Sequence, residues 1–113
     1  MENFMDIAIM IESQNGLTWP RWQNIAAAVE DLGFAGLYRS DHFTNAQPPD
    51  KESLELWVSL TWLASHTKRI EFGPLVSPVS FRHPALTARM ALTFNLALAP
   101  DRSRCRGKIA DCP

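Results

Sequence analysis

Cysteine is scarce in this chain of 113 residues, and its two examples, Cys105 and Cys112, both lie among the last nine positions. Their spacing, CRGKIADC, matches neither a CxxC redox pair nor a zinc-binding pattern, so we interpret them as incidental thiols and expect no metal site. An excess of one charge is also missing, since the formal net charge is −1, and this argues against a nucleic-acid partner.

Long apolar runs are absent as well. No stretch approaches the roughly 18 uninterrupted apolar residues of a membrane span. The N-terminal stretch MENFMDIAIMIE carries acids where a secretory signal carries positive charge. We therefore expect a cytoplasmic protein with no membrane partner.

Several common catalytic and binding motifs do not occur. The chain has no GxGxxG, Walker loop, HExxH or GxSxG pattern. The sequence therefore lacks the motifs typical of dinucleotide-binding and nucleotide-binding proteins, zinc proteases and serine hydrolases.

Three similar units follow one another, each an apolar strand-like run, a polar turn and a segment with helical periodicity. The strand-like runs cover residues 6–11, 35–39 and 70–76. The first of them is short and almost continuously apolar, as a strand buried on both faces is. Alternation of such strands with amphipathic helices predicts an α/β fold with parallel strands.

The helix boundaries have recognisable signals. Thr18 is a suitable N-cap for the first helix, and Gly33 stands where a left-handed residue ends it. Asp50 or Ser53 is the expected cap of the second helix, and Pro84 begins the third. The helical positions also hold all four tryptophans, which we assign to the core: Trp19, Trp22, Trp57 and Trp62.

Gly73 and Pro74 lie inside the third strand. Proline lacks a donor for the hydrogen-bond ladder, so we expect a bulge or bend at this point. The three strands leave two exposed edges and cannot close a barrel. We therefore expect this sequence to be the first part of a longer protein. We expect a domain over residues 1–96. Residues 97–113 have no apolar period and are interpreted as a disordered or foreign tail.

Polar side chains follow the predicted strands where parallel α/β folds place their sites. Asp41 and His42 follow the second strand, and Ser77 follows the third. From the residues alone, Asp41 could equally be a turn former and His42 a satisfied, half-buried imidazole. Arg82 and His83 could serve an anion, but a solvated charge and a helix cap are the preferred interpretation.

Two stretches together carry a family resemblance. AVEDLGFAGLYRSDHF (residues 28–43) and IEFGPLVSPVSFRHPALTARMA (residues 70–91) resemble the bacterial-luciferase-like flavin-dependent oxidoreductases. The likeness runs from about residue 6 to residue 94. It is nearest the branch that uses the deazaflavin coenzyme F-420, with monooxygenases that use flavin mononucleotide (FMN) as relatives. The resemblance implies a TIM (β/α)8 barrel, of which this truncated chain would supply the first three βα units.

The resemblance also implies roles for individual residues. Asp41 would contact the cofactor, and His42 would be the catalytic residue, acting as a proton donor or as a group on the substrate side. A non-prolyl cis peptide bond between Pro74 and Leu75 would lie behind the cofactor ring, and the hydroxyl of Ser77 would contact the cofactor. The irregularity expected independently at Pro74 agrees with that placement.

Two departures from the family pattern limit these implications. Ala46 stands where related sugar-phosphate dehydrogenases have an aromatic residue, which argues against sugar-phosphate chemistry. From about Asn95 the family's glycine-rich continuation is replaced by NLALAPDRSRCRGKIADCP. A loss of reading frame or the end of a gene fragment would explain that change better than a genuine alternative terminus.

We therefore expect the N-terminal part of an oxidoreductase that carries out hydride transfer or monooxygenation on a small organic substrate. Its cofactor would be coenzyme F-420, with FMN as the alternative, and the chain alone would be inactive. One competing hypothesis is a non-catalytic remnant. Another is a small interaction module that adds strands to a partner through its open edges. Those edges also predict homo-oligomers or aggregation.

Overall fold

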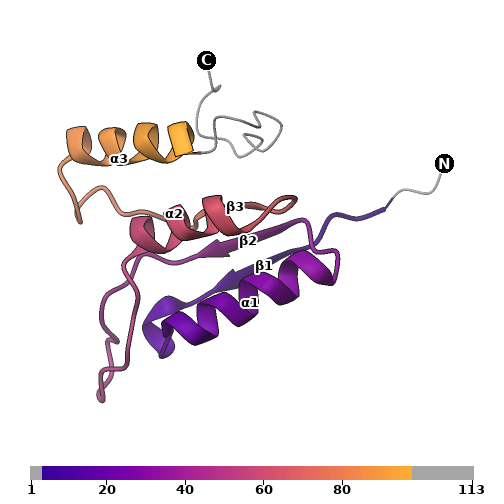
Figure 1. The fold of residues 1–113 in the computed structure, drawn as a ribbon. Coiled ribbons are helices and arrows are strands. Elements are labelled where there is room, and N and C mark those ends of the chain that lie inside the picture. Colours follow the sequence, from indigo (N-terminus) through magenta and orange to yellow (C-terminus); the bar gives the residue numbers. More distant parts are fainter. Residues whose placement is uncertain (1–3, 98–113) are drawn as a thin grey trace.

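The structure, a computed structural model, describes residues 4–97 and contains three consecutive βα units (Figure 1). In chain order the elements are β1 (Ala8–Ile11), a 3-10 turn (Ser13–Asn15), α1 (Trp19–Asp31), β2 (Gly36–Arg39), α2 (Leu56–His66), β3 (Glu71–Pro74) and α3 (Pro84–Ala97). The sheet has the order β1-β2-β3, and both neighbouring pairs are parallel. The predicted α/β class with parallel strands is confirmed, although each strand is shorter than its apolar run.

The sheet has two different faces because side chains alternate along each strand. Ile9 pairs with Leu37, and Leu37 pairs with Phe72, so these three side chains share the face that packs against the helices. The opposite face holds Tyr38, whose ring lies over Gly36 of its own strand and Gly73 of β3. A Cβ at Gly36 would come within 3.0 Å of the Glu71 carbonyl oxygen, so this close approach requires glycine.

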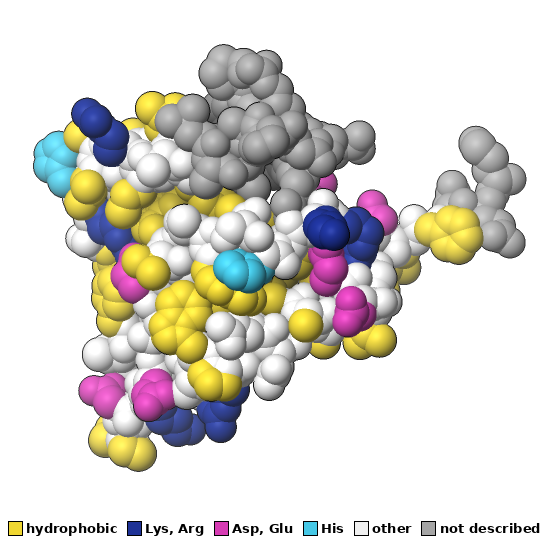
Figure 2. All heavy atoms as spheres, in the orientation of Figure 1, with side chains coloured by type: hydrophobic (Ala, Val, Ile, Leu, Met, Phe, Trp, Pro, Cys, Tyr) yellow, Lys and Arg dark blue, Asp and Glu magenta, His cyan; other side chains and the backbone are white. Residues whose placement is uncertain are grey.

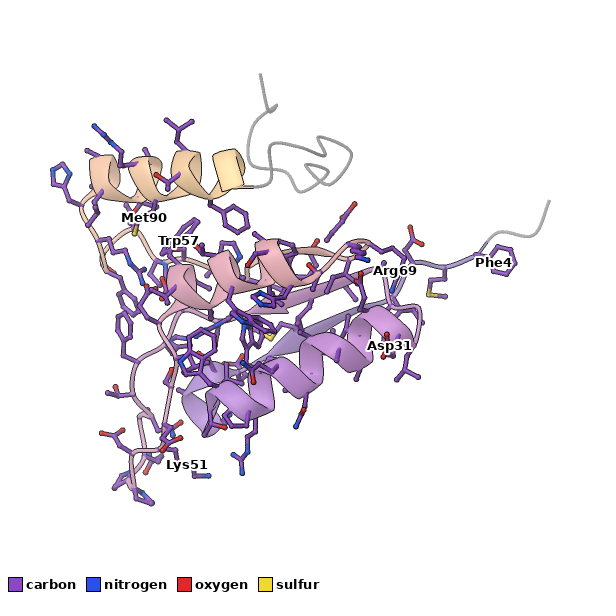
Figure 3. All side chains as sticks on the ribbon, in the orientation of Figure 1. Phe4, Asp31, Lys51, Trp57, Arg69 and Met90 are labelled. Atoms are coloured by element: carbon purple, nitrogen blue, oxygen red, sulfur yellow. The ribbon has the colours of Figure 1, made fainter. Side chains whose placement is uncertain are left out.

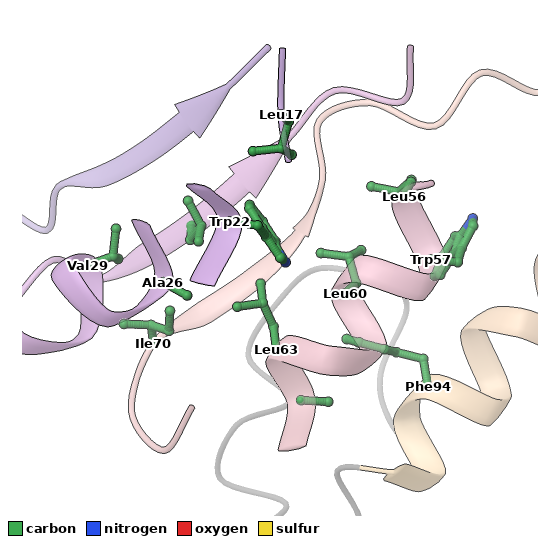
Figure 4. Close-up of a cluster of buried hydrophobic side chains, with 12 residues drawn as sticks. Leu17, Trp22, Ala26, Val29, Leu56, Trp57, Leu60, Leu63, Ile70 and Phe94 are labelled. Carbon is green, nitrogen blue, oxygen red and sulfur yellow. The ribbon is translucent and has the colours of Figure 1, made fainter. Parts of the chain in front are cut away.

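The core lies between the sheet and the helices (Figure 4). From α1 it receives Trp22, Ala26 and Val29, and from α2 it receives Leu56, Trp57, Leu60, Leu63 and Ala64. Phe94 of α3 contacts Trp57 edge-to-face at 6.4 Å, and Met90 packs beside them (Figure 3). α2 is therefore covered on two sides, as its wide apolar arc requires.

The prediction that the tryptophans are core residues is confirmed for Trp22 and Trp57, which are 0% and 6% exposed. Trp62 is partly buried and stacks on His66 with ring centroids 4.2 Å apart. Trp19 is 37% exposed, so it lies at the margin of the core.

The first helix begins and ends as its sequence predicts. Thr18 is the N-cap of α1 and accepts a hydrogen bond from the Arg21 amide. Gly33, just past the helix, has φ of 84°, the left-handed conformation expected of it.

The cap of the second helix was predicted wrongly. Glu55, not Asp50 or Ser53, is the N-cap, and its carboxylate accepts the Val58 amide at 2.7 Å. Asp50 instead accepts the Asn45 amide at 3.1 Å, and Ser53 donates to the His42 carbonyl at 2.6 Å. Both expected caps are thus engaged by the loop that precedes α2.

Of the two irregularities expected at Gly73 and Pro74, the bulge is absent, and a bend follows one residue later, at Leu75. The β2–β3 register runs without interruption from Gly36–Glu71 to Arg39–Pro74, and the Leu75 amide still donates to the Arg39 carbonyl at 2.8 Å. Successive amides of a strand point to opposite sides, so the missing donor of Pro74 faces away from β2. Proline fits there because β3 is an edge of the sheet in the part of the chain that the structure describes.

Apolar side chains remain on the surface, and charged side chains of both signs are scattered among them (Figure 2). At the β1 edge Ile7 and Met10 are 54% and 40% exposed. Within residues 4–97, no helix has the length and apolar character needed to cross a membrane. The predicted tail lies outside the described residues, apart from its first residue, which ends α3.

Candidate functional site

The carboxyl ends of the three strands lie at one end of the sheet, where the loops to α1, α2 and α3 begin (Figure 1). Residues 12–18, 40–55 and 75–83 form these connections. They bring together the polar side chains that the sequence placed after each strand.

Asp41 lies at the centre of this end of the sheet. Its side chain is 1% exposed, and its Oδ2 accepts a hydrogen bond of 3.0 Å from the hydroxyl of Ser77. Asp41 and Ser77, which the sequence places after neighbouring strands, therefore lie together. The reason is topological, because the loops after two parallel neighbouring strands leave the sheet on the same side.

Arg82 supplies the counter-charge for this buried carboxylate. Its two terminal nitrogens donate to the two oxygens of Asp41, with the Nη2 to Oδ1 distance at 3.1 Å. Nη2 also donates to Glu55 Oε1 at 2.5 Å. The interpretation of Arg82 as a solvated charge is wrong, since its side chain is only 10% exposed and bridges two carboxylates.

These contacts raise the pKa of Arg82. Its hydrogen bond to Asp41 raises the pKa of the guanidinium, and the bond to Glu55 adds to that effect against the opposing effect of burial. His83 next to it does behave as the expected cap, because its Nδ1 accepts the Ala85 amide at the start of α3.

Arg39 is a second buried cation beside the same carboxylates. It is fully buried and donates to the Leu54 carbonyl at 2.5 Å and to the Ser59 hydroxyl at 2.5 Å. Burial lowers its pKa to about 10, while the charges of Asp41 and Glu55 act in the opposite direction. Arg39, Asp41, Glu55 and Arg82 form what we call the charge cluster, which contains two cations and two anions.

A network of hydroxyl groups joins the ends of β1 and β2 next to the charge cluster. The Ser13 amide donates to Ser40 Oγ at 3.0 Å, and Ser40 Oγ donates to Gln14 Oε1 at 3.1 Å. The His42 carbonyl accepts from both Ser13 Oγ and Ser53 Oγ, at 3.3 and 2.6 Å. These bonds fix the backbone on which Asp41 and His42 stand.

His42 is in a different environment from Asp41. Its ring is exposed and meets Phe81 edge-to-face at 6.4 Å, while Phe81 stacks on Phe43 at 5.5 Å. We call His42, Phe43 and Phe81 the aromatic rim. The guanidinium of Arg82 lies 5.6 Å from the centre of the Phe43 ring, which connects the rim to the charge cluster.

The cis peptide bond was predicted one residue too early. It lies between Leu75 and Val76, not between Pro74 and Leu75. The ladder explains the difference, because the Leu75 amide still bonds to Arg39 and the chain leaves β2 only after that residue. Leu75 and Val76 are 49% and 65% exposed, so they present an apolar surface between Pro74 and Ser77.

Sequence reasoning missed Arg82 as the partner of Asp41, and it did not mark Glu55 or Arg39 at all. One signal was available for Arg82. A carboxylate buried at the end of a strand needs a counter-charge, and Arg82 is the cation in the segment SPVSFRH that follows the neighbouring strand.

A planar cofactor ring fits part of this arrangement. The exposed Leu75 and Val76, the half-buried Ser77 and the aromatic rim present apolar surface with one hydroxyl and one imidazole. Asp41 reaches that surface through Ser77, since both of its oxygens are already bonded. A metal is a poorer fit, because no group of three potential ligands occurs among residues 4–97.

A depression of about 450 Å³ lies beside this region, between the start of α1 and the loop before α2. Its lining includes Trp19, Ser53 and Leu54. None of the sequence-predicted site residues contributes to it.

Comparison with known proteins agrees with the resemblance read from the sequence. Coenzyme F-420-dependent tetrahydromethanopterin reductase from Methanopyrus kandleri superposes with a TM-score of 0.61 at 22% identity, over 82% of this chain and 24% of the reductase. The riboflavin lyase RcaE, solved with modified FMN and riboflavin, gives a TM-score of 0.70 at 15% identity, over 85% of this chain and 28% of the lyase. At these identities the similarity is one of fold.

The chain thus spans about a quarter of the length of either solved structure. No curated protein sequence matches it. The sequence model of the luciferase-like monooxygenases, in contrast, matches residues 5–102, which is most of the chain. The protein therefore belongs to the luciferase-like monooxygenase family.

Proposed function

We propose that these βα units form the part of a flavin- or deazaflavin-dependent oxidoreductase against which the cofactor ring lies. The observation that carries this proposal is the buried Asp41 bonded to Ser77 at the carboxyl ends of β2 and β3, beside the exposed Leu75 and Val76. Sites of parallel α/β enzymes lie at this end of the sheet.

Each residue of the site would have a separate role in binding the cofactor or in proton transfer. Ser77 would contact the cofactor through its hydroxyl, and Asp41 would hold that hydroxyl in place while remaining buried. Pro74 and Leu75 would support the ring from the end of β3. His42, exposed on the aromatic rim, would exchange a proton with the substrate.

The chemistry of the reaction would come from the bound cofactor, which transfers a hydride or activates oxygen on a small organic substrate. Coenzyme F-420 is the proposed cofactor because the sequence resembles the branch that uses it, and FMN is the alternative. The two superposed structures do not separate these, since one is an enzyme dependent on F-420 and the other is solved with modified FMN.

The chain alone is expected to be inactive and to bind neither cofactor appreciably. Barrel sites draw their residues from the ends of several strands, and the described part of this chain supplies three. A reconstituted complex is therefore the proper test. We define it as this chain expressed together with the βα units that follow the corresponding third helix in a full-length family member.

Fluorescence titration with coenzyme F-420 and with FMN tests the proposal. The reconstituted complex should bind one of the two, and the chain alone should bind neither at micromolar concentration. Asp41→Ala should weaken binding, whereas His42→Ala should lower turnover more than cofactor affinity. A soluble complex that binds neither cofactor would contradict the proposal.

The exposed β1 edge favours one other candidate, an interaction module that pairs with a partner strand. Ile7 and Met10 are exposed beside that edge, and within residues 4–97 β1 pairs with β2 alone, which leaves its other side open to β-augmentation. Sedimentation of the chain alone separates the two candidates. A stable monomer that retains its fold without cofactor would support the module.

A further inference from the structure

The side chain of Arg82 connects three parts of the candidate site: the end of β2, the start of α2 and the segment between β3 and α3. It belongs to the segment between β3 and α3, two residues before the first residue of α3. From there it contacts Asp41 at the end of β2 and Glu55 at the start of α2, across sequence separations of 41 and 27 residues. No other ion pair within the described residues joins such distant segments.

The contacts of Arg82 leave the carboxylate of Asp41 little freedom. Arg82 bonds to both of its oxygens, and one of these, Oδ2, also accepts the Ser77 hydroxyl at 3.0 Å. Rotation of the carboxylate would break both kinds of bond at once. The direction of the Ser77 hydroxyl is therefore set by the orientation of Asp41, and that orientation is set by Arg82.

Arg82 is itself held from several sides. Its Nη2 bonds to Glu55 Oε1, while the other oxygen of Glu55 accepts the Val58 amide and so remains tied to the start of α2. The ring of Phe43 lies 5.6 Å from the guanidinium carbon. A planar group with donors in a fixed fork suits this geometry, and the single charged tip of a lysine does not.

We propose that Arg82 is a positioning residue of the cofactor site, which orients the carboxylate of Asp41 and, through it, the hydroxyl of Ser77. This inference rests on the proposed function only in that Ser77 faces the cofactor. Arg82 is not itself a cofactor contact, because its donors are directed at Asp41 and Glu55.

The test compares Arg82→Gln with Arg82→Lys in the reconstituted complex. Arg82→Gln should weaken cofactor binding on the order of tenfold to a hundredfold, as expected for the loss of a charge-assisted hydrogen bond. Arg82→Lys should recover only part of that loss because it keeps the charge without the fork. Arg89→Gln, on the exposed surface of α3, is the matched control and should change nothing.

A carbon-13 NMR measurement on labelled aspartate reports the positioning directly. The Asp41 carboxyl resonance, assigned with Asp41→Asn, should shift in Arg82→Gln and stay in place in Arg89→Gln. If Arg82→Gln leaves both this resonance and cofactor affinity unchanged, the inference is overturned. If the wild-type complex binds neither cofactor but the resonance shifts, the proposed function fails while the positioning role stands.

A double variant separates positioning from general damage to the fold. In an Asp41→Asn background, the additional change Arg82→Gln should weaken cofactor binding by less than about twofold, because its effect passes through Asp41. An undiminished effect in that background would mean that Arg82 acts through the fold alone and would overturn the inference.

Discussion

Trp22 is the side chain whose truncation should weaken this fold most. It is fully buried where α1 meets α2, and its indole Nε1 donates to the Ser59 carbonyl at 3.1 Å. Its ring also lies 5.7 Å from the guanidinium carbon of Arg39. Trp22→Ala should therefore lower the free energy of unfolding by about 3–5 kcal/mol, the usual cost of truncating a large buried aromatic side chain.

Two further variants divide that cost into its parts. Trp22→Phe keeps much of the apolar contact but loses the hydrogen bond to Ser59 and part of the ring volume, which should cost about 2 kcal/mol. Trp19→Phe changes the same residue type one turn earlier on α1, at a position that is 37% exposed. It should cost less than about 0.5 kcal/mol.

Urea unfolding of the reconstituted complex, followed by far-ultraviolet circular dichroism, measures all three variants on one scale. The midpoint should fall in the order Trp19→Phe, Trp22→Phe, Trp22→Ala, while the dependence on denaturant stays constant. If Trp22→Ala proved no more costly than Trp19→Phe, Trp22 would not join α1 to α2 as the structure indicates.

Two other predictions concern the opposite end of the sheet. The carboxylate of Glu30 accepts the backbone amides of three successive residues, Lys68 to Ile70. Burial opposes ionisation of Glu30, but these hydrogen bonds and the charge of Arg69 outweigh it, so the pKa of Glu30 is lowered. Because Glu30 is partly exposed and solvent screens its contacts, Glu30→Gln should lose less than about 1 kcal/mol at neutral pH. The difference from wild type should shrink in acid unfolding curves as the pH falls below the ordinary pKa of about 4.5, because protonation of Glu30 removes the charge that these bonds stabilise. Gly36→Ala should cost about 2 kcal/mol or more, because its Cβ would press on the Glu71 carbonyl. Gly33→Ala, with open space but φ of 84°, should cost only about 1 kcal/mol, and thermal unfolding of the pair checks the contrast.

The order and type of the elements could be predicted because their signals are local. Apolar runs, helical periodicity and residues such as Thr18 and Pro84 act within a few positions of the element they define. The cap of α2 could not be predicted in this way. Asp50 and Ser53 are good caps by residue type, but Asn45 and the His42 carbonyl occupy them, and those contacts depend on the path of the whole loop.

The candidate site was predictable to the extent that it follows from parallel topology. Asp41 and Ser77 meet because they leave neighbouring strands at the same end. The ion pair to Arg82 spans 41 positions and needs the segment after β3 to fold back over β2, which no local pattern specifies. The position of the cis bond depended in the same way on how far the β3 ladder extends beyond Pro74.

Asp41 and His42 show why adjacent residues can hold separate roles at one strand end. Successive side chains leave the backbone on opposite sides, so Asp41 turns into the charge cluster while His42 stays exposed beside Phe81. A carboxylate bonded by Ser77 and Arg82 is suited to holding geometry, since moving it breaks several bonds. An exposed imidazole is suited to exchanging protons with a substrate that binds and is released. Asp41 and His42 therefore do not depend on a hydrogen bond to each other, because each is held by different neighbours.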